Sequence, residues 1–249
     1  MARILRTLVL AALVMTASVA LAQQTYKVGS TPTGVPFTFM DTKTQQITGA
    51  MVDLITAIGD SQGFKVTVEA TPFSALIPSL TSNKIDIISA AMLITPARQE
   101  VIDFSDPVFP YPEGMIVKAD DKKEYKSLAD LKGETVGAQV GTVYVDFLKK
   151  NGEFTEVKTY DSIADIIRDV GLGRIKAGFG DAPIVRYQVS QRKDAGVRFV
   201  ETYQPKMEGS VGIGTRKGEK ELMAKINAGL AQVKKSGKLD EILKKWNLK

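Results

Sequence analysis

The chain has 249 residues, with 33 lysines and arginines against 28 acidic residues and a formal net charge of +5. It contains neither histidine nor cysteine, which excludes ordinary zinc sites, disulfide bonds and nucleophiles activated by histidine. A carboxylate or lysine enzyme stays possible, but we expect no metal and no cofactor. The basic residues near the C-terminus resemble a solvated helix face more than a nucleic-acid groove, so we expect no nucleic-acid partner.

Residues 1–22 have the three parts of a secretory signal peptide. Arg3 and Arg6 precede an apolar run at residues 8–14, and residues 20–22 (Ala-Leu-Ala) form a typical cleavage pattern. The apolar run is short for a membrane span, although an uncleaved signal anchor is an alternative. No cysteine follows the cleavage site to carry a lipid. In a bacterial host we therefore expect a periplasmic protein that is not a lipoprotein.

The next part of the chain alternates between strand and helix patterns. Met51, Leu54, Ile55 and Ile58 have helical spacing, whereas residues 64–68 alternate as in a strand. The elements predicted in chain order are a strand at 26–30, a helix at 51–59, a strand at 64–68, a helix at 76–80, a strand at 85–88, a helix from 95 and a turn at 104–107.

The second half of the chain repeats this alternation. Ser162 and Asp165 have the spacing of a helix capping box, and glycines at 171 and 173 would end that helix. Alternation of this kind predicts an α/β fold with parallel sheets covered by helices. The predicted elements are a strand at 115–117, a short helix at 127–131, a strand at 135–138, helices beginning at 142 and 162, a strand ending at 180, and two C-terminal helices.

Two segments rich in proline and glycine, residues 108–114 and 204–212, are candidate linkers. Because they flank a central block, that block is predicted to be inserted into the first domain. We expect a first lobe made of residues 23–110 and 205–249, and a second lobe made of residues 111–204.

The sequence from Thr95 to Arg98 (TPAR) places a cation at a helix start. With Thr95 at N-cap and Pro96 at N1, Arg98 occupies N3, where the helix dipole favours carboxylates instead. Either a neighbouring acid or solvent absorbs this cost, or Arg98 and the helix N-terminus together hold an anion. The residues alone leave both interpretations open.

These features, taken in order, resemble the extracellular solute-binding proteins of family 3, the periplasmic receptors of polar amino acid ABC importers. The resemblance implies a fold like that of type II periplasmic binding proteins, with two α/β lobes joined by two hinge strands. It also implies an amino acid or related carboxylate ligand, an ABC transporter permease as partner and a monomeric protein. The similar segments are 77–80 (IPSL), 84–86 (KID), 95–98 (TPAR), 103–107 (DFSDP), 128–133 (LADLKG), 141–142 (GT), 173–174 (GR), Asp181 and 244–246 (KKW).

The resemblance further implies which residues bind the ligand. Arg98 would clamp the ligand carboxylate with its planar fork of donors. The helix start formed by Gly141, Thr142 and Val143 would offer backbone N–H groups to the same carboxylate. Asp181 would take the ligand amine. Without the resemblance, an ordinary capped helix and a turn acid before a proline are the simpler interpretations of these positions.

Other positions depart from the family pattern. Phe73 matches an aromatic wall of the pocket, although a plain core phenylalanine is an alternative. Thr31 stands where many members carry aspartate, Gly34 where they carry a stacking aromatic, and Ala91 and Leu93 where small or hydroxyl residues usually bind the ligand. The missing acid at Thr31 argues against a cationic ligand side chain. We expect a carboxylate ligand that is bulkier or less polar than the common amino acids.

Two other functions compete with transport. A few proteins of this fold act as dehydratases on cyclic carboxylic acids, a reaction that requires a general acid near the leaving group. Beyond Asp181, no acid is clearly placed for that role. A ligand-sensing periplasmic protein would share the same sequence features. We expect a transport receptor and not an enzyme.

Overall fold

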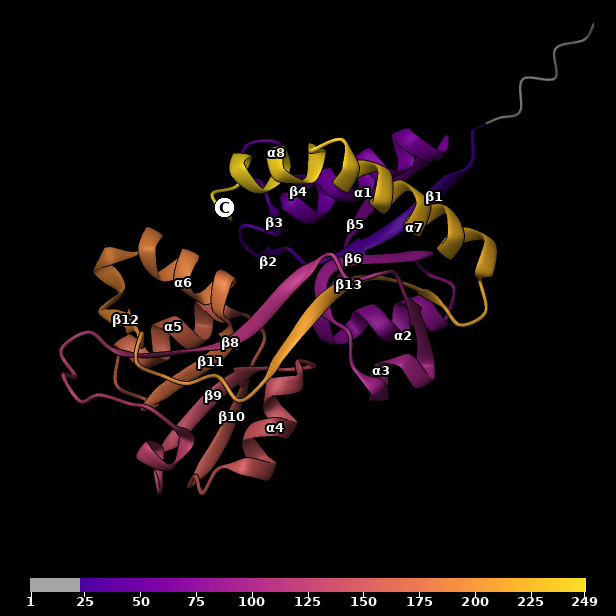
Figure 1. Ribbon diagram of the computed structural model, residues 1–249. Coiled ribbons are helices and arrows are strands. Elements are labelled where there is room, and N and C mark those ends of the chain that lie inside the picture. The colour runs from indigo at the N-terminus through magenta and orange to yellow at the C-terminus, as the bar shows by residue number, and fades with distance from the viewer. Residues whose placement is uncertain (1–22) are drawn as a thin grey trace, which may run out of the picture.

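The computed structural model describes residues 23–249, so the predicted signal peptide lies outside the described residues. Figure 1 shows two α/β lobes joined by two long strands, β8 (Phe109–Lys118) and β13 (Glu208–Arg216). Each lobe has its own set of helices packed on its part of the sheet. The architecture is therefore the two-lobed fold implied by the family resemblance.

The first lobe contains a parallel core of strands covered by helices. Its elements are β1 (Thr25–Ser30), β2 (Thr33–Gly34), β3 (Thr38–Met40), β4 (Ile47–Thr48), α1 (Ala50–Gln62), β5 (Lys65–Ala70), η1 (Phe73–Ala75), α2 (Leu76–Thr81), β6 (Ile87–Leu93), α3 (Pro96–Val101), β7 (Ile102–Phe104), α7 (Lys220–Lys235) and α8 (Lys238–Lys245). β1 pairs in parallel with β5 and β6, while β2, β3 and β4 form a small separate sheet. The turn predicted at 104–107 begins only at residue 105 in the structure, because Phe104 still belongs to β7.

Helix α1 confirms the helical spacing seen in the sequence. Its apolar residues Met51, Leu54, Ile55 and Ile58 are each at most 1% exposed. Burial of such side chains contributes about 1.5–3 kcal/mol each. A Cβ placed on Gly229 of α7 would lie 2.8 Å from Ile58, so this glycine lets the two helices approach closely. The pair of helices closes one face of the first lobe.

The second lobe repeats the same layering on a smaller sheet. Its elements are η2 (Leu128–Leu131), β9 (Thr135–Gln139), α4 (Val143–Asn151), β10 (Glu156–Tyr160), α5 (Ile163–Gly171), β11 (Ala177–Asp181), α6 (Ala182–Gln191), η3 (Lys193–Ala195) and β12 (Val197–Phe199). β9 pairs in parallel with β10 and β11. The short helix predicted at 127–131 is a 3₁₀ turn, whose start is held by the Asp130 carboxylate accepting the backbone N–H of Ser127 at 2.8 Å.

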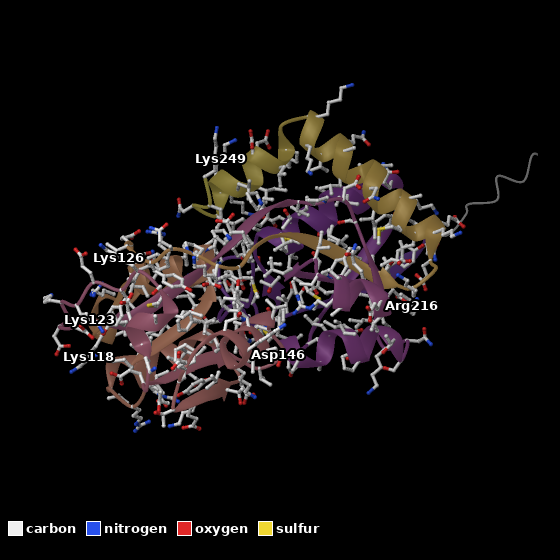
Figure 2. All side chains as sticks on the ribbon, turned by 60° about the horizontal axis from the view of Figure 1, so that its bottom comes forward. Lys118, Lys123, Lys126, Asp146, Arg216 and Lys249 are labelled. Carbon is white, nitrogen blue, oxygen red and sulfur yellow. The ribbon has the colours of Figure 1, made fainter. Side chains whose placement is uncertain are left out.

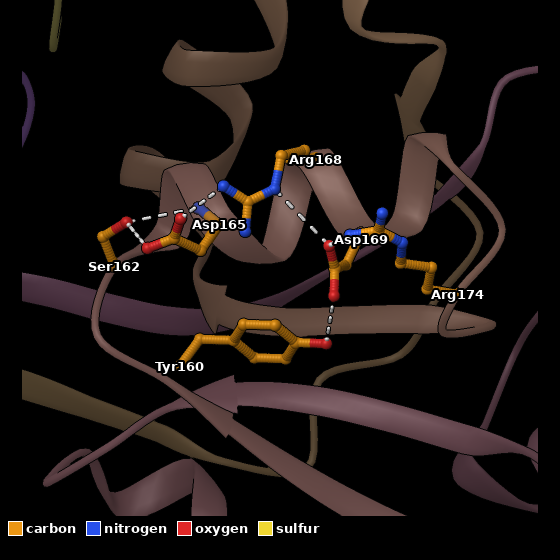
Figure 3. A network of polar contacts seen from close by, with 6 residues as sticks. All are labelled: Tyr160, Ser162, Asp165, Arg168, Asp169 and Arg174. Carbon is orange, nitrogen blue, oxygen red and sulfur yellow. Dashed lines mark hydrogen bonds and ion pairs between the residues drawn. The ribbon is translucent and has the colours of Figure 1, made fainter.

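A polar network fixes helix α5 to the neighbouring strand β10 (Figure 3). Ser162 caps the helix by accepting the backbone N–H of Asp165 at 3.2 Å, which confirms the predicted start. Further along the helix, Asp169 accepts hydrogen bonds from the Tyr160 hydroxyl and the Arg174 guanidinium, both at 3.1 Å. These bonds hold α5 in one orientation, and its first residue reaches the interlobe cavity described below.

The two crossing strands turn the sheets of both lobes into one. β8 and β13 run antiparallel and pair between residues 109–112 and 208–211. Beyond this short ladder, β8 pairs with β11 and β13 pairs with β6, giving the order β10-β9-β11-β8-β13-β6-β1-β5. The predicted linkers therefore lie largely in strands, and these strands make the sheet mixed where a purely parallel one was expected. The predicted lobe boundaries remain a prediction.

Positive charge is spread over the molecule. Figure 2 shows Lys118, Lys123 and Lys126 at the outer end of the second lobe, whereas Lys249 lies on the C-terminal helices of the first lobe. Within residues 23–249, no helix is both long and apolar enough to cross a membrane.

Candidate functional site

A small enclosed cavity lies between the lobes. Open α/β sheets bind ligands at the carboxyl ends of their strands, and here β1, β9 and β11 end at this cavity. Thr31, Gly34, Phe73, Thr142 and Asp181 were predicted from the sequence and belong to its lining. The full lining consists of Thr31, Thr33, Gly34, Phe37, Thr38, Phe73, Ala90, Gln139, Thr142, Ile163, Asp181 and Ile184.

Arg98 connects the two lobes beside this cavity. Thr95 caps α3 as predicted, since its hydroxyl accepts the backbone N–H of Arg98 at 3.3 Å. The guanidinium donates to the Leu93 carbonyl at 2.8 Å and, across the lobes, to the Gly141 carbonyl at 3.1 Å. It also lies over the Phe73 ring, 5.6 Å from its centroid. The guanidinium is thus fixed in place and aimed at the start of α4.

The second lobe approaches Arg98 through a backbone segment that requires glycine. Gly141 has a φ of +77°, and a Cβ there would lie 2.7 Å from the Cα of Ser74 in the first lobe. Thr142 is the N-cap residue of α4, but its hydroxyl does not cap the helix. It donates instead to the Gln139 carbonyl at 2.7 Å. Thr142 lines the cavity, and its hydroxyl does not bind the free backbone N–H groups at the N-terminus of α4.

Asp181 is half-buried and paired with a tyrosine that the sequence analysis missed. The Tyr144 hydroxyl donates to the Asp181 carboxylate at 2.7 Å. Burial raises the pKa of Asp181 to about 6, although Tyr144 and Arg98 act in the opposite direction. Burial also lowers the pKa of the Arg98 guanidinium, and Asp181 raises it. The only hint of Tyr144 in the sequence was its place two residues after Thr142.

The family departures at positions 31 and 34 have a local explanation. The hydroxyls of Thr31 and Thr38 lie 2.6 Å apart and satisfy each other. A Cβ on Gly34 would meet the Thr31 hydroxyl at 3.1 Å, so the threonine pair fills the space where an aromatic was expected. Phe37 supplies an aromatic wall instead, and stacks on Phe109 with ring centroids 5.3 Å apart. This wall also escaped the sequence analysis.

Five of the predicted residues are not among those that line the cavity: Arg98 and Gly141, which lie beside it, and three others. Ala91 is buried and has a φ of +50°, and its neighbour Ala90 lines the cavity in its place. Leu93 contributes its carbonyl to Arg98. Val143 is the first residue of α4 and packs against the core. Their roles in ligand binding stay predictions.

The protein has two lobes on a shared sheet, and an arginine from one lobe and an acid from the other lie beside an enclosed cavity. This arrangement defines the class of two-lobed solute-binding proteins. The chain belongs to the bacterial extracellular solute-binding proteins, family 3, whose model matches residues 26–249.

Individual relatives show the same relationship. The chain is 31% identical to ABC transporter arginine-binding protein 1 of Escherichia coli, over 97% of this chain and 99% of that protein. Among solved structures, an ancestral arginine-binding protein bound to glutamine is 36% identical, with a TM-score of 0.84 over 91% of this chain and 99% of that one. An ancestral amino acid-binding protein, a precursor of cyclohexadienyl dehydratase, is 32% identical, with a TM-score of 0.80 over 89% and 94%.

Proposed function

We propose that the protein binds an α-amino acid, or a closely related amino-carboxylate, in the interlobe cavity and delivers it to an ABC transporter permease. The observation that carries this proposal is the pair of opposite charges beside the cavity, with Arg98 from the first lobe and Asp181 from the second. An α-amino acid carries a carboxylate and an ammonium group on one carbon. A compact pair of this kind can therefore hold both ends of the ligand backbone.

The ligand carboxylate would bind Arg98. The guanidinium already donates to a neutral carbonyl, that of Gly141, and a carboxylate is the stronger acceptor for the same fork. The N-terminus of α4 adds backbone N–H groups and a positive dipole end at the same place. These contacts come from both lobes, so ligand binding favours the closed arrangement.

The ligand ammonium would bind Asp181. Burial favours the neutral carboxyl, but an arriving cation favours the ionised form and so lowers the pKa of Asp181. Phe37 and Phe73 then cover the apolar part of the ligand. The amine contact is therefore expected to weaken when the carboxyl keeps its proton.

Several further properties follow from this proposal. Residues 1–22 would direct the protein to the periplasm and be removed there. The protein would act as a monomer without a nucleic-acid partner, with closure presenting both lobes to the permease. Relatives named as arginine-binding and periplasmic support transport.

A dehydratase activity is the alternative, because one structural neighbour is a precursor of such an enzyme. Asp181, with a pKa of about 6, could hold a proton for a leaving group. We nevertheless propose that the protein is not an enzyme. Incubation with prephenate should give no product beyond the buffer rate, and enzyme-dependent product would favour the alternative.

Thermal unfolding with a panel of L-amino acids tests the proposed function. A ligand at about a hundred times its dissociation constant stabilises the folded state by about 2.7 kcal/mol. Arg98→Ala should abolish the shift in melting temperature, whereas Arg192→Ala, at an exposed position of the second lobe, should retain it. An equal shift in the wild type and in Arg98→Ala would contradict the assigned role of Arg98.

A further inference from the structure

Three tyrosines of the second lobe each donate a hydrogen bond to an aspartate. Two of these aspartates also pair with a basic side chain: Asp121 with Lys176 at 2.7 Å, and Asp169 with Arg174 at 3.1 Å. No basic side chain in the described part of the chain forms such an ion pair with Asp181. The three bonds are Tyr125 to Asp121 at 2.8 Å, Tyr144 to Asp181 at 2.7 Å and, in Figure 3, Tyr160 to Asp169 at 3.1 Å.

The different partners shift the pKa values of two of these aspartates in opposite directions. Burial raises the pKa of Asp121, but the hydrogen bonds from Lys176 and Tyr125 lower it more, to about 2. Burial also raises the pKa of Asp181, and there the opposing effects of Tyr144 and Arg98 leave it at about 6. A carboxylate of this kind is further stabilised when a cation arrives beside it. Asp181 is therefore the aspartate that retains bonding capacity.

Tyr144 engages one oxygen of Asp181 and leaves the other accessible. Its hydroxyl donates to Oδ1. No described side chain donates to Oδ2, and Oδ2 is not among the buried side-chain atoms that lack a partner, so it keeps accessible surface. Asp181 lines the enclosed cavity, whereas Tyr144 is 1% exposed and packs in the core. The second oxygen is thus the one that a ligand in the cavity can reach.

Tyr144 also belongs to the helix that begins at the proposed carboxylate site. It is the second residue of α4, and Arg98 donates to the Gly141 carbonyl just before that helix. Burial raises the pKa of Tyr144 well above its usual value, so the hydroxyl stays a donor throughout the working pH range. A binding group that is held by a packed neighbour in this way is preorganised. One helix therefore supports both ends of the proposed ligand backbone.

The other titratable groups that face Asp181 come from α3 and β8. Arg98 of α3 lowers the pKa of Asp181 through space. Tyr111 of β8 is fully buried, which raises its pKa well above the usual value and keeps it neutral. Glu113 lies opposite Asp181 in the pairing of β8 with β11, and burial raises its pKa. Within residues 23–249, Tyr144 is the side chain that donates a hydrogen bond to Asp181.

We propose that Tyr144 is a positioning residue for ligand recognition, whose hydroxyl holds Oδ1 of Asp181 so that the ionised carboxylate presents Oδ2 to the ligand ammonium. This inference rests on the proposed function, because that function supplies the ammonium. The hydroxyl stabilises the ionised form, so its loss raises the pKa of Asp181. Affinity at mildly acidic pH therefore depends on a side chain that does not touch the ligand.

Calorimetric titration of wild type and Tyr144→Phe at pH 6 and pH 8.5 tests this role. The probes are L-arginine, L-glutamine, L-glutamate and L-leucine, which share their backbone groups and differ in the side chain. One hydrogen bond to a charged group corresponds to a pKa shift of about one unit. Each probe that binds should then lose about fivefold in affinity at pH 6 and less than about twofold at pH 8.5, where Asp181 is ionised in both proteins.

Tyr125→Phe is the matched control. It removes a similar buried hydroxyl from an aspartate of the same lobe, but Asp121 keeps its ion pair with Lys176 and does not line the cavity. This control should leave affinity unchanged at both pH values. Both variants keep the buried ring, and melting curves at each pH verify that they are folded.

A second measurement requires no ligand. Carbon-13 NMR of the Asp181 carboxyl follows its ionisation directly in the purified protein. The titration midpoint should move upward by about one pH unit in Tyr144→Phe and stay in place in Tyr125→Phe.

The outcomes separate this inference from the proposed function. An equal affinity loss at both pH values indicates a merely structural role and overturns the inference, as does unchanged affinity at pH 6. An unmoved Asp181 titration in Tyr144→Phe also overturns it. All three results leave the amino acid receptor intact. If none of the four probes binds the wild type at either pH, the proposed function fails and the inference fails with it.

Discussion

The two walls of the cavity differ in their polar chemistry. On the side of the first lobe, Thr31 and Thr38 satisfy each other, and the aromatic rings of Phe37 and Phe73 supply shape. On the side of the second lobe, Asp181 is a half-buried acid whose pKa is raised. We therefore expect the satisfied wall of the first lobe to select ligands by volume, and the charged wall of the second lobe to select them by their charged groups. Under the proposed function, Arg98 is the contribution of the first lobe to charge recognition, and its guanidinium donates across the lobes to the Gly141 carbonyl.

The approach of the two walls should be most sensitive at Gly141. An alanine there combines a positive φ with a clash against the backbone of Ser74. The closed state should lose roughly 3 kcal/mol, so that ligand affinity falls by about a hundredfold in calorimetry. Gly173→Ala is the matched control, since φ is +71° there and no atom lies within 4 Å of the added Cβ. Equal affinity losses in both variants would mean that backbone strain at a positive φ, and not hindered closure of the two lobes, lowers ligand affinity.

The charged wall should respond to pH in two opposite ways. The pKa of Asp181 is raised to about 6 in the folded state from an ordinary value of 3.8. The folded state therefore binds the extra proton between these values, and its stability falls as the pH rises through this window. Ligand affinity should instead rise with pH and level off above about pH 6, because the ammonium needs the ionised carboxylate.

Asp181→Asn tests the pH dependence of both stability and ligand affinity. It should reduce the difference in unfolding free energy between pH 4.5 and 7.5, measured by denaturant titration. It should also lower ligand affinity at pH 7 by about tenfold. If affinity keeps the wild-type pH profile in this variant, another group controls binding.

The satisfied wall should give the smallest effect. Phe73→Leu keeps an apolar side chain but removes the ring below Arg98, where a cation–π contact contributes about 0.5–1 kcal/mol. Ligand affinity should fall about threefold to fivefold. Phe64→Leu changes a buried ring that packs against Tyr26 elsewhere in the first lobe. That control should lower the melting temperature and leave affinity unchanged.

Much of the fold could be predicted because its signals are local. Helical spacing placed α1, and the hydroxyl caps at Thr95 and Ser162 placed the starts of α3 and α5. The crossing strands were harder to see, since Pro110 and Pro112 resemble a linker. In the structure both prolines lie where β8 has a partner strand on one side only, a position that tolerates a missing N–H.

The candidate site was predictable only where a motif marks it. Arg98 and Asp181 stand in recognisable sequence contexts, and in the structure Asp181 lines the cavity while Arg98 lies beside it and interacts with Asp181 electrostatically. Tyr144 and Phe37 carry no such context, because their importance arises from contacts between segments far apart in the chain.

The short ladder between β8 and β13 also has a mechanical consequence. Four residue pairs, from Phe109 with Val211 to Pro112 with Glu208, join the two lobes edge to edge in one sheet. Rotation of one lobe relative to the other must therefore twist this ladder, and the rotation axis passes close to it. Residues on the ladder, Tyr111 among them, move least during that rotation, while side chains at the rim of the cavity move furthest.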